Sequence, residues 1–161
     1  MKEFQNKPHP IVYLFCGLPG SGKTTYAKKI ETGGIVRLSL DEELFRLFGR
    51  DFKPEQYADF ERKTKDALIN RTPLYIKDGR PIILDWGFWK KKERSEIRSL
   101  FESVGAEVKL IYFKKNLNAL ERGVANRDLS KNHEIGPKML KNFANQFEEP
   151  GGNENYTLPA S

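Results

Sequence analysis

The chain has 161 residues, 38% of them hydrophobic and 31% charged with both signs mixed, which indicates one globular domain and excludes a fibrous or disordered protein. Its net charge of +6 suits a nucleic-acid surface, a nucleotide-binding cleft or a solvated basic face, and does not decide between them. One cysteine excludes an intrachain disulfide, and one cysteine with two histidines is too few for a zinc site.

Four apolar runs predict the strands of a parallel sheet. The first, Ile11 to Cys16, is apolar throughout and ends at Gly17, which is typical of a strand buried on both faces. Three similar runs, separated by polar segments of helical spacing, follow at residues 35–38, 81–84 and 108–113. This alternation predicts an α/β fold of βαβ units with right-handed crossovers. The runs are too short to span a bilayer and the N-terminus is polar, so we expect a cytoplasmic protein with no membrane partner.

Glycines and a capping pattern set the ends of the first two predicted helices. The first helix is expected to run from residue 23 to about residue 31 and to stop at the glycine pair 33–34, which supplies a left-handed turn. Ser39 and Glu42 form a capping-box pattern, which predicts a second helix that runs through Phe48.

A long polar helix is expected to follow, opened by Pro54. Thr72 and Pro73 are a cap residue and a proline suited to the first helical position, so they predict a break and a short new helix that ends at Gly79.

The remaining chain completes the domain. Further helices are expected over residues 90–103, from Asn116 and from Pro137, with a polar loop at residues 128–136. Residues 150–161 are rich in glycine, asparagine and proline, which is typical of a loosely held tail. We therefore expect one domain over residues 1–150 and a flexible tail at residues 151–161.

Residues 17–24 match the G-x-x-x-x-G-K-[ST] phosphate loop in full. The motif lies between a buried strand and a helix, so backbone N–H groups and the helix N-terminus can surround phosphate oxygens. Lys23 can reach the β- and γ-phosphates, and the Thr24 hydroxyl can ligate Mg²⁺. The expected ligands are thus ATP and Mg²⁺, bound by Gly17, Leu18, Pro19, Gly20, Ser21, Gly22, Lys23, Thr24 and Thr25.

Two aspartates follow predicted strands, at the edge of the sheet where ligands bind in open α/β folds. Asp85 follows an apolar strand and is a candidate second magnesium-holding group, although an aspartate can equally cap the turn after a strand. Asp41 is a candidate base that takes the proton from an acceptor hydroxyl. The alternative for Asp41 is an early helical acid favoured by the helix dipole.

Three arginines are candidates for contacts to phosphate. Arg46 can hold a phosphate or an acceptor group, or lie on a helix surface. Arg122 and Arg127 would point about 140° apart in one continuous helix, so both face the phosphates only if the helix ends near Asn126. The polar loop at residues 128–136 would then act as a lid that brings arginine to the transferred group. The alternative is a pair of exposed helix cations.

Aromatic residues crowd the segment after Asp85. Trp86 and Trp89 are candidates for a wall that stacks on the acceptor, together with Phe88. Aromatic side chains are more often part of a core, and this alternative stays open.

These motifs together resemble the small P-loop kinases related to the phage polynucleotide kinase domain, zeta toxins and chloramphenicol phosphotransferase, within the P-loop NTPases of AAA-type ATP binding. The resemblance spans roughly residues 11–150. It implies Asp41 as the base and Arg122 and Arg127 as lid arginines. It also implies a three-layer α/β/α sandwich with four or five parallel strands and a helical lid.

The sequence departs from the polynucleotide kinase pattern in two places. That pattern has an arginine three residues after the catalytic aspartate, where this chain has Leu44 and the nearest arginine is Arg46. The segment 86–89 is also more aromatic than in that enzyme. Both departures count against a nucleic-acid acceptor.

We therefore expect a kinase that uses ATP and Mg²⁺ to phosphorylate a hydroxyl of a small molecule. A 5′-hydroxyl polynucleotide kinase is the alternative with a nucleic-acid partner, and the basic charge favours it. A regulatory NTPase without an acceptor is a third hypothesis, which would need neither Asp41 nor the aromatic segment.

Overall fold

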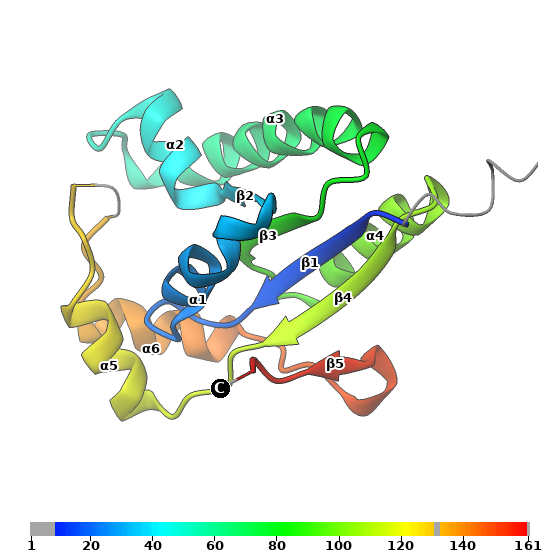
Figure 1. The fold of residues 1–161 in the computed structure, drawn as a ribbon. Coiled ribbons are helices and arrows are strands. Elements are labelled where there is room, and N and C mark those ends of the chain that lie inside the picture. The colour runs from blue at the N-terminus through cyan, green and yellow to red at the C-terminus, as the bar shows by residue number, and fades with distance from the viewer. Residues whose placement is uncertain (1–8, 131–132, 161) are drawn as a thin grey trace, which may run out of the picture.

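The computed structural model describes residues 9–130 and 133–160, and its centre is a parallel sheet of five strands in the order β2-β3-β1-β4-β5 (Figure 1). The strands are β1 Ile11–Cys16, β2 Val36–Ser39, β3 Ile82–Gly87, β4 Glu107–Tyr112 and β5 Tyr156–Thr157. β1 lies between β3 and β4 and pairs with both in parallel. The carboxyl ends of the strands therefore meet at one edge of the sheet, where the loop that follows β1 begins.

Helices cover both faces of the sheet. The helices are α1 Lys23–Ile30, α2 Leu40–Phe48, α3 Tyr57–Lys77, α4 Lys91–Ser103, α5 Leu117–Ala125 and α6 Pro137–Gln146. Successive side chains of β1 alternate between the faces: Leu14 packs in the cluster that contains Leu68 of α3 and Phe101 of α4, and Phe15 packs with Ala27 of α1. Each of these fully buried large side chains contributes about 1.5–3 kcal/mol relative to exposure. The predicted three-layer α/β/α fold is confirmed.

α5 and α6 pack together at the carboxyl-terminal edge of the sheet. Leu120 of α5 and Leu140 of α6 form a third core cluster with Leu18 of the loop after β1. α5 ends at Ala125 with Asn126 as its C-cap residue. The helix therefore ends near Asn126, as expected, and Arg127 lies beyond the helix that carries Arg122. Residues 131 and 132 of the expected lid loop lie outside the described residues.

The predicted break at Thr72 and Pro73 is wrong, because α3 continues from Tyr57 to Lys77 with Pro73 inside it. A proline cannot donate to the carbonyl four residues earlier, which here belongs to Ile69. The Thr72 hydroxyl donates to this same carbonyl at 2.7 Å, so the oxygen still accepts a hydrogen bond. The residue expected to cap a new helix instead maintains the old one.

The prediction of a loosely held tail after Pro150 also differs from the structure. Residues Tyr156–Thr157 form β5, which pairs in parallel with Leu110 and Ile111 of β4. Just before it, Glu154 accepts hydrogen bonds from the buried Arg94 guanidinium at 2.7 and 3.2 Å. A charge buried at Arg94 requires a partner, and the chain after Pro150 supplies it. Within the described residues no helix is long and apolar enough to cross a membrane.

Candidate functional site

The phosphate loop at residues 17–24 is held in shape by its own chain and by β3. Gly17 N donates to Gly87 O at 2.9 Å, and Ser21 N donates to Leu18 O at 3.2 Å. Gly20 and Gly22 have φ of 84° and 93°, in the left-handed region that glycine adopts without strain. The loop then enters α1, so its backbone N–H groups and the helix N-terminus lie on the same side.

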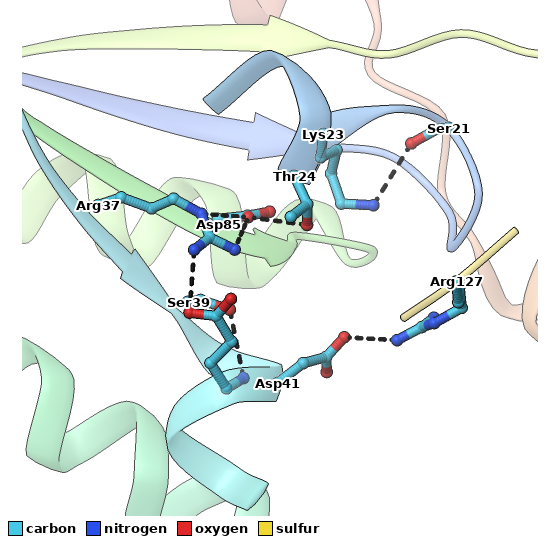
Figure 2. A network of polar contacts seen from close by, with 9 residues as sticks. Ser21, Lys23, Thr24, Arg37, Ser39, Asp41, Asp85 and Arg127 are labelled. Atoms are coloured by element: carbon cyan, nitrogen blue, oxygen red, sulfur yellow. Dashed lines mark hydrogen bonds and ion pairs between the residues drawn. The ribbon is translucent and has the colours of Figure 1, made fainter. Parts of the chain in front are cut away.

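Lys23 folds back over this loop. Its ammonium donates to the carbonyls of Gly17 and Leu18 at 2.9 Å each. It also donates to the Ser21 hydroxyl at 3.3 Å (Figure 2). Burial lowers the pKa of Lys23, and the carboxylates of Asp85 and Asp41 oppose this shift. The three hydrogen bonds of this ammonium all go to neutral groups, so a triphosphate would supply anionic acceptors in their place, and the loop and Lys23 fit a nucleotide.

Thr24 and Asp85 meet beside the loop. The Thr24 hydroxyl donates to Asp85 Oδ2 at 3.1 Å, which leaves the hydroxyl lone pairs for a cation. No cluster of three or more histidine, cysteine, aspartate or glutamate side chains that could hold a metal occurs in the described part of the chain. Mg²⁺ commonly takes one or two protein ligands and completes its shell with phosphates and water, so this oxygen pair fits a nucleotide-bound Mg²⁺.

Arg37 of β2 contacts the same carboxylate, and the sequence pattern gave no indication of it. Its Nε and Nη2 lie 3.1 and 3.0 Å from Asp85 Oδ2, and Nη1 lies 3.0 Å from Glu42 (Figure 2). The Arg37 side chain is 5% exposed. Its burial would lower its pKa, but the charges of Asp85 and Glu42 outweigh this and raise it.

Asp41 and Arg127 form an ion pair across the open side of the loop. Arg127 Nη2 lies 3.0 Å from Asp41 Oδ2, although the residues are 86 positions apart (Figure 2). Asp41 directly follows the first residue of α2, whose N-cap Ser39 accepts from Glu42 N at 3.3 Å. Arg127 Nε is buried and has no hydrogen-bond partner among the described residues. A phosphate oxygen would satisfy this donor.

The other predicted arginines lie outside this cluster. Arg122 is exposed on α5. Arg46 pairs with Glu43 of its own helix, and Glu43 also pairs with Arg71 of α3. Arg46 is therefore engaged on the α2–α3 contact, and the structure gives it no bond to Asp41. The cluster consists of Lys23, Thr24, Asp41, Asp85 and Arg127, with Arg37 added.

Trp86 lies in the core, and Trp89 is half-buried against the cluster of Leu18, Leu120 and Leu140. Trp86 is 8% exposed, stacks on Phe88 with ring centroids 5.0 Å apart, and donates to Glu93 at 2.9 Å. Trp89 packs on Phe143 of α6, with centroids 4.8 Å apart. Because β3 alternates between faces, Trp86 points away from the side that presents Asp85. The core alternative therefore describes Trp86, and the acceptor-wall prediction for the half-buried Trp89 stays a prediction.

α5 and the phosphate loop touch through two glycines. A Cβ at Gly123 would lie 2.6 and 2.7 Å from backbone atoms of Gly20, closer than real Cβ atoms approach a backbone. A Cβ at Gly20 would in turn lie 2.9 Å from Val124 N. The helix that leads to Arg127 is thus packed directly on the loop that would hold phosphate.

Lys23→Met is expected to weaken triphosphate affinity by about 10–100-fold, since hydrogen bonds to a charged group are worth about 1.5–3 kcal/mol. Because the pKa of Lys23 is lowered, the unaltered protein should lose affinity as pH rises, beginning below the pH of an ordinary lysine. The Met variant should show no such loss. Calorimetric titration with Mg·ATP from neutral to alkaline pH measures both effects, and Lys28→Met on the exposed face of α1 is the control. Equal affinity for Lys23→Met and the unaltered protein would contradict the assignment of Lys23.

A family model described as AAA domain matches residues 12–150. Among solved structures, a proposed kinase from Chloroflexus aurantiacus j-10-fl has a TM-score of 0.73 at 18% identity, over 92% of this chain and 85% of the other. A gluconokinase from Sinorhizobium meliloti 1021 has a TM-score of 0.61 at 17% identity, over 96% and 83%. No curated protein sequence matches the chain.

A chain of the Pnkp1/Rnl/Hen1 RNA repair complex has a TM-score of 0.69 at 18% identity. The match covers 91% of this chain but only 46% of the other, so this chain spans less than half of that relative's length. At these identities the likeness establishes the fold alone, an α/β fold like that of the P-loop NTPases.

Proposed function

The chain belongs to the family of AAA domains, and from this premise we propose that it is an ATP- and Mg²⁺-dependent kinase acting on a hydroxyl of a small molecule. The observation that carries the proposal is the Asp41–Arg127 pair at 3.0 Å, within electrostatic range of Lys23. A nucleotide switch needs the phosphate loop and a metal ligand. A carboxylate opposite the loop that can accept the proton of a hydroxyl is what transfer requires in addition, and the arginine places its charge beside the transferred group.

The side chains divide the work as follows. Lys23 and the loop N–H groups would hold the β- and γ-phosphates, and Thr24 and Asp85 would hold the Mg²⁺. When bound, Mg·ATP would supply the phosphoryl group, and its Mg²⁺ would neutralise part of the charge. Asp41 accepts the proton of the acceptor hydroxyl, whose oxygen forms a bond to the γ-phosphorus. The bond from that phosphorus to the β,γ-bridging oxygen breaks, and ADP keeps the electron pair. Arg127 stabilises the charge on the transferred group.

The packing of α2 supports a small acceptor over a nucleic acid. The polynucleotide kinase pattern has an arginine at position 44, where this chain has a fully buried leucine. The core at this position would not accommodate a charged guanidinium. The 5′-hydroxyl polynucleotide kinase remains the second candidate, favoured by the net charge of +6 and by the fold shared with a chain of the RNA repair complex. A regulatory NTPase is the third and requires no acceptor.

A ligand screen tests the proposal. Melting temperature is measured with Mg·ATP plus nucleosides, sugars, antibiotics or short oligonucleotides, because a ligand of the folded state stabilises it by mass action. Hits are then assayed for a phosphorylated product. A small-molecule product supports the proposal, and an oligonucleotide product whose yield falls steeply with salt selects the second candidate. ATP hydrolysis without any phosphorylated acceptor selects the third.

A further inference from the structure

Arg37 donates two of its hydrogen bonds to Asp85, the carboxylate beside Thr24 where Mg²⁺ would bind. Two of its nitrogens contact the one oxygen of Asp85 that Thr24 also contacts, while its third contacts Glu42. The Asp85 side chain is 3% exposed, so water screens this interaction little. Arg37 and Asp85 lie on neighbouring strands, where parallel pairing places Arg37 opposite Ile83, two residues before the aspartate.

The Arg37 contact determines what Asp85 can do for Thr24. A buried carboxylate without a counter-charge is costly, and it would rotate or recruit water to satisfy its oxygens. With Arg37 fixed on Oδ2, that oxygen stays within reach of the Thr24 hydroxyl hydrogen. The hydroxyl then keeps its lone pairs directed to the position of a cation. Partners that orient the groups around a metal in this way commonly affect metal affinity as strongly as the ligands themselves.

A second consequence concerns the proposed base. Arg37 also holds Glu42, the residue next to Asp41, at the first turn of α2. One guanidinium therefore connects the metal side of the site to the start of the helix that carries the acceptor-side carboxylate. β2 and α2 are fixed to β3 by this contact at the edge of the sheet where the reaction would occur.

We propose that Arg37 is a positioning residue that orients Asp85, and through it Thr24, so that Mg²⁺ strengthens nucleotide binding. The proposal rests on the proposed function only in requiring a nucleotide bound with Mg²⁺. The rest of the nucleotide site, the loop N–H groups and Lys23, does not depend on Arg37. Loss of Arg37 should therefore affect the contribution of the metal and spare metal-free binding.

The experiment uses the full chain and the β,γ-imido analogue of ATP. Its affinity is measured by calorimetry in excess EDTA and again at saturating Mg²⁺, and the ratio of the two affinities gives the enhancement by the metal. For Arg37→Gln we expect this enhancement to fall by about 10–100-fold, with the affinity in EDTA unchanged. Arg37→Lys keeps the charge but has only one nitrogen, so it should recover part of the enhancement.

The control is Arg80→Gln, at the other end of β3, where the arginine is exposed and donates to Gly34 O at 3.2 Å. It should leave the enhancement as in the unaltered protein. An Arg37→Gln protein with a lowered melting temperature but an unchanged enhancement would overturn the proposal, since Arg37 would then serve the fold alone. If Arg37→Gln does not fold, an unchanged enhancement in Arg37→Lys overturns it equally, and a reduced one supports it. An unaltered protein that does not bind the analogue would instead refute the proposed function.

Discussion

Asp41→Asn is expected to slow phosphoryl transfer by about 10²–10⁴-fold, the usual contribution of a general base, and to leave ATP affinity nearly unchanged. Asparagine keeps the shape of the side chain and can still donate and accept hydrogen bonds, but it cannot take the proton of the acceptor. Slow ATP hydrolysis should fall less, because the attacking water need not be the one that Asp41 contacts. Transfer to the acceptor identified by the screen and hydrolysis are measured on the same sample.

The two rates together separate the hypotheses. A transfer rate that falls alone supports Asp41 as the base. Equal losses in both reactions, or no loss in either, would contradict that role. Asp59→Asn, an exposed carboxylate of α3 that pairs with Arg62 and Lys63, is the matched control and should leave both rates unchanged.

Arg127→Ala is expected to lower the transfer rate by about 10³-fold, in the range of an arginine that stabilises the transferred group. The guanidinium acts on charge that develops as the phosphoryl group moves, so its loss should reduce kcat more than nucleotide affinity. Single-turnover rates at saturating ATP and acceptor measure the effect. Arg62→Ala, an exposed arginine of similar ion pairing, is the control.

The double variant examines the ion pair itself. Since Asp41 and Arg127 contact each other at 3.0 Å, their effects on the rate should not add, and the double variant should be less impaired than the product of the single losses. If Arg127→Ala transfers phosphate as fast as the unaltered protein, Arg127 has no role in the reaction, and the alternative of a surface cation is correct. Additive losses would show that the two residues act independently, so that the contact between them does not contribute to the reaction.

The sequence predicts local features of this fold well. β1 has the predicted bounds, because an apolar run that ends at a glycine leaves little choice of register. Ser39 caps α2 and Asn116 caps α5 as expected, since a cap needs only residues within the next turn. The phosphate loop is equally local, with Lys23 and Thr24 only a few residues from its glycines.

Features that depend on distant partners were not predicted. The role of Arg37 depends on Asp85, 48 residues away, and an arginine within an apolar strand gives no indication of its partner. β5 has two residues, too few for an alternating pattern. Its position depends on the ion pair between Glu154 and the distant Arg94. Aromatic residues such as Trp86 and Trp89 are more often part of a core, but composition leaves the wall open, and only the packing distinguishes the two. Pro73 was misjudged because the compensating hydroxyl lies on the residue before it.

Gly20 and Gly123 are in direct backbone contact, which is a point about which α5 can pivot on the phosphate loop. With no side chain between them, α5 and the loop can rotate against each other, but moving them apart would leave a gap. Arg127 lies four positions beyond Gly123, just past the C-cap residue Asn126 of α5, and its amide donates to Val124 O at 3.3 Å. A displacement of this turn by about 1 Å would stretch the 3.0 Å ion pair with Asp41 beyond hydrogen-bonding distance. Small movements of the loop backbone would thus reach the guanidinium of Arg127 through α5. Whether a ligand occupies the loop would then affect whether Arg127 stays paired with Asp41.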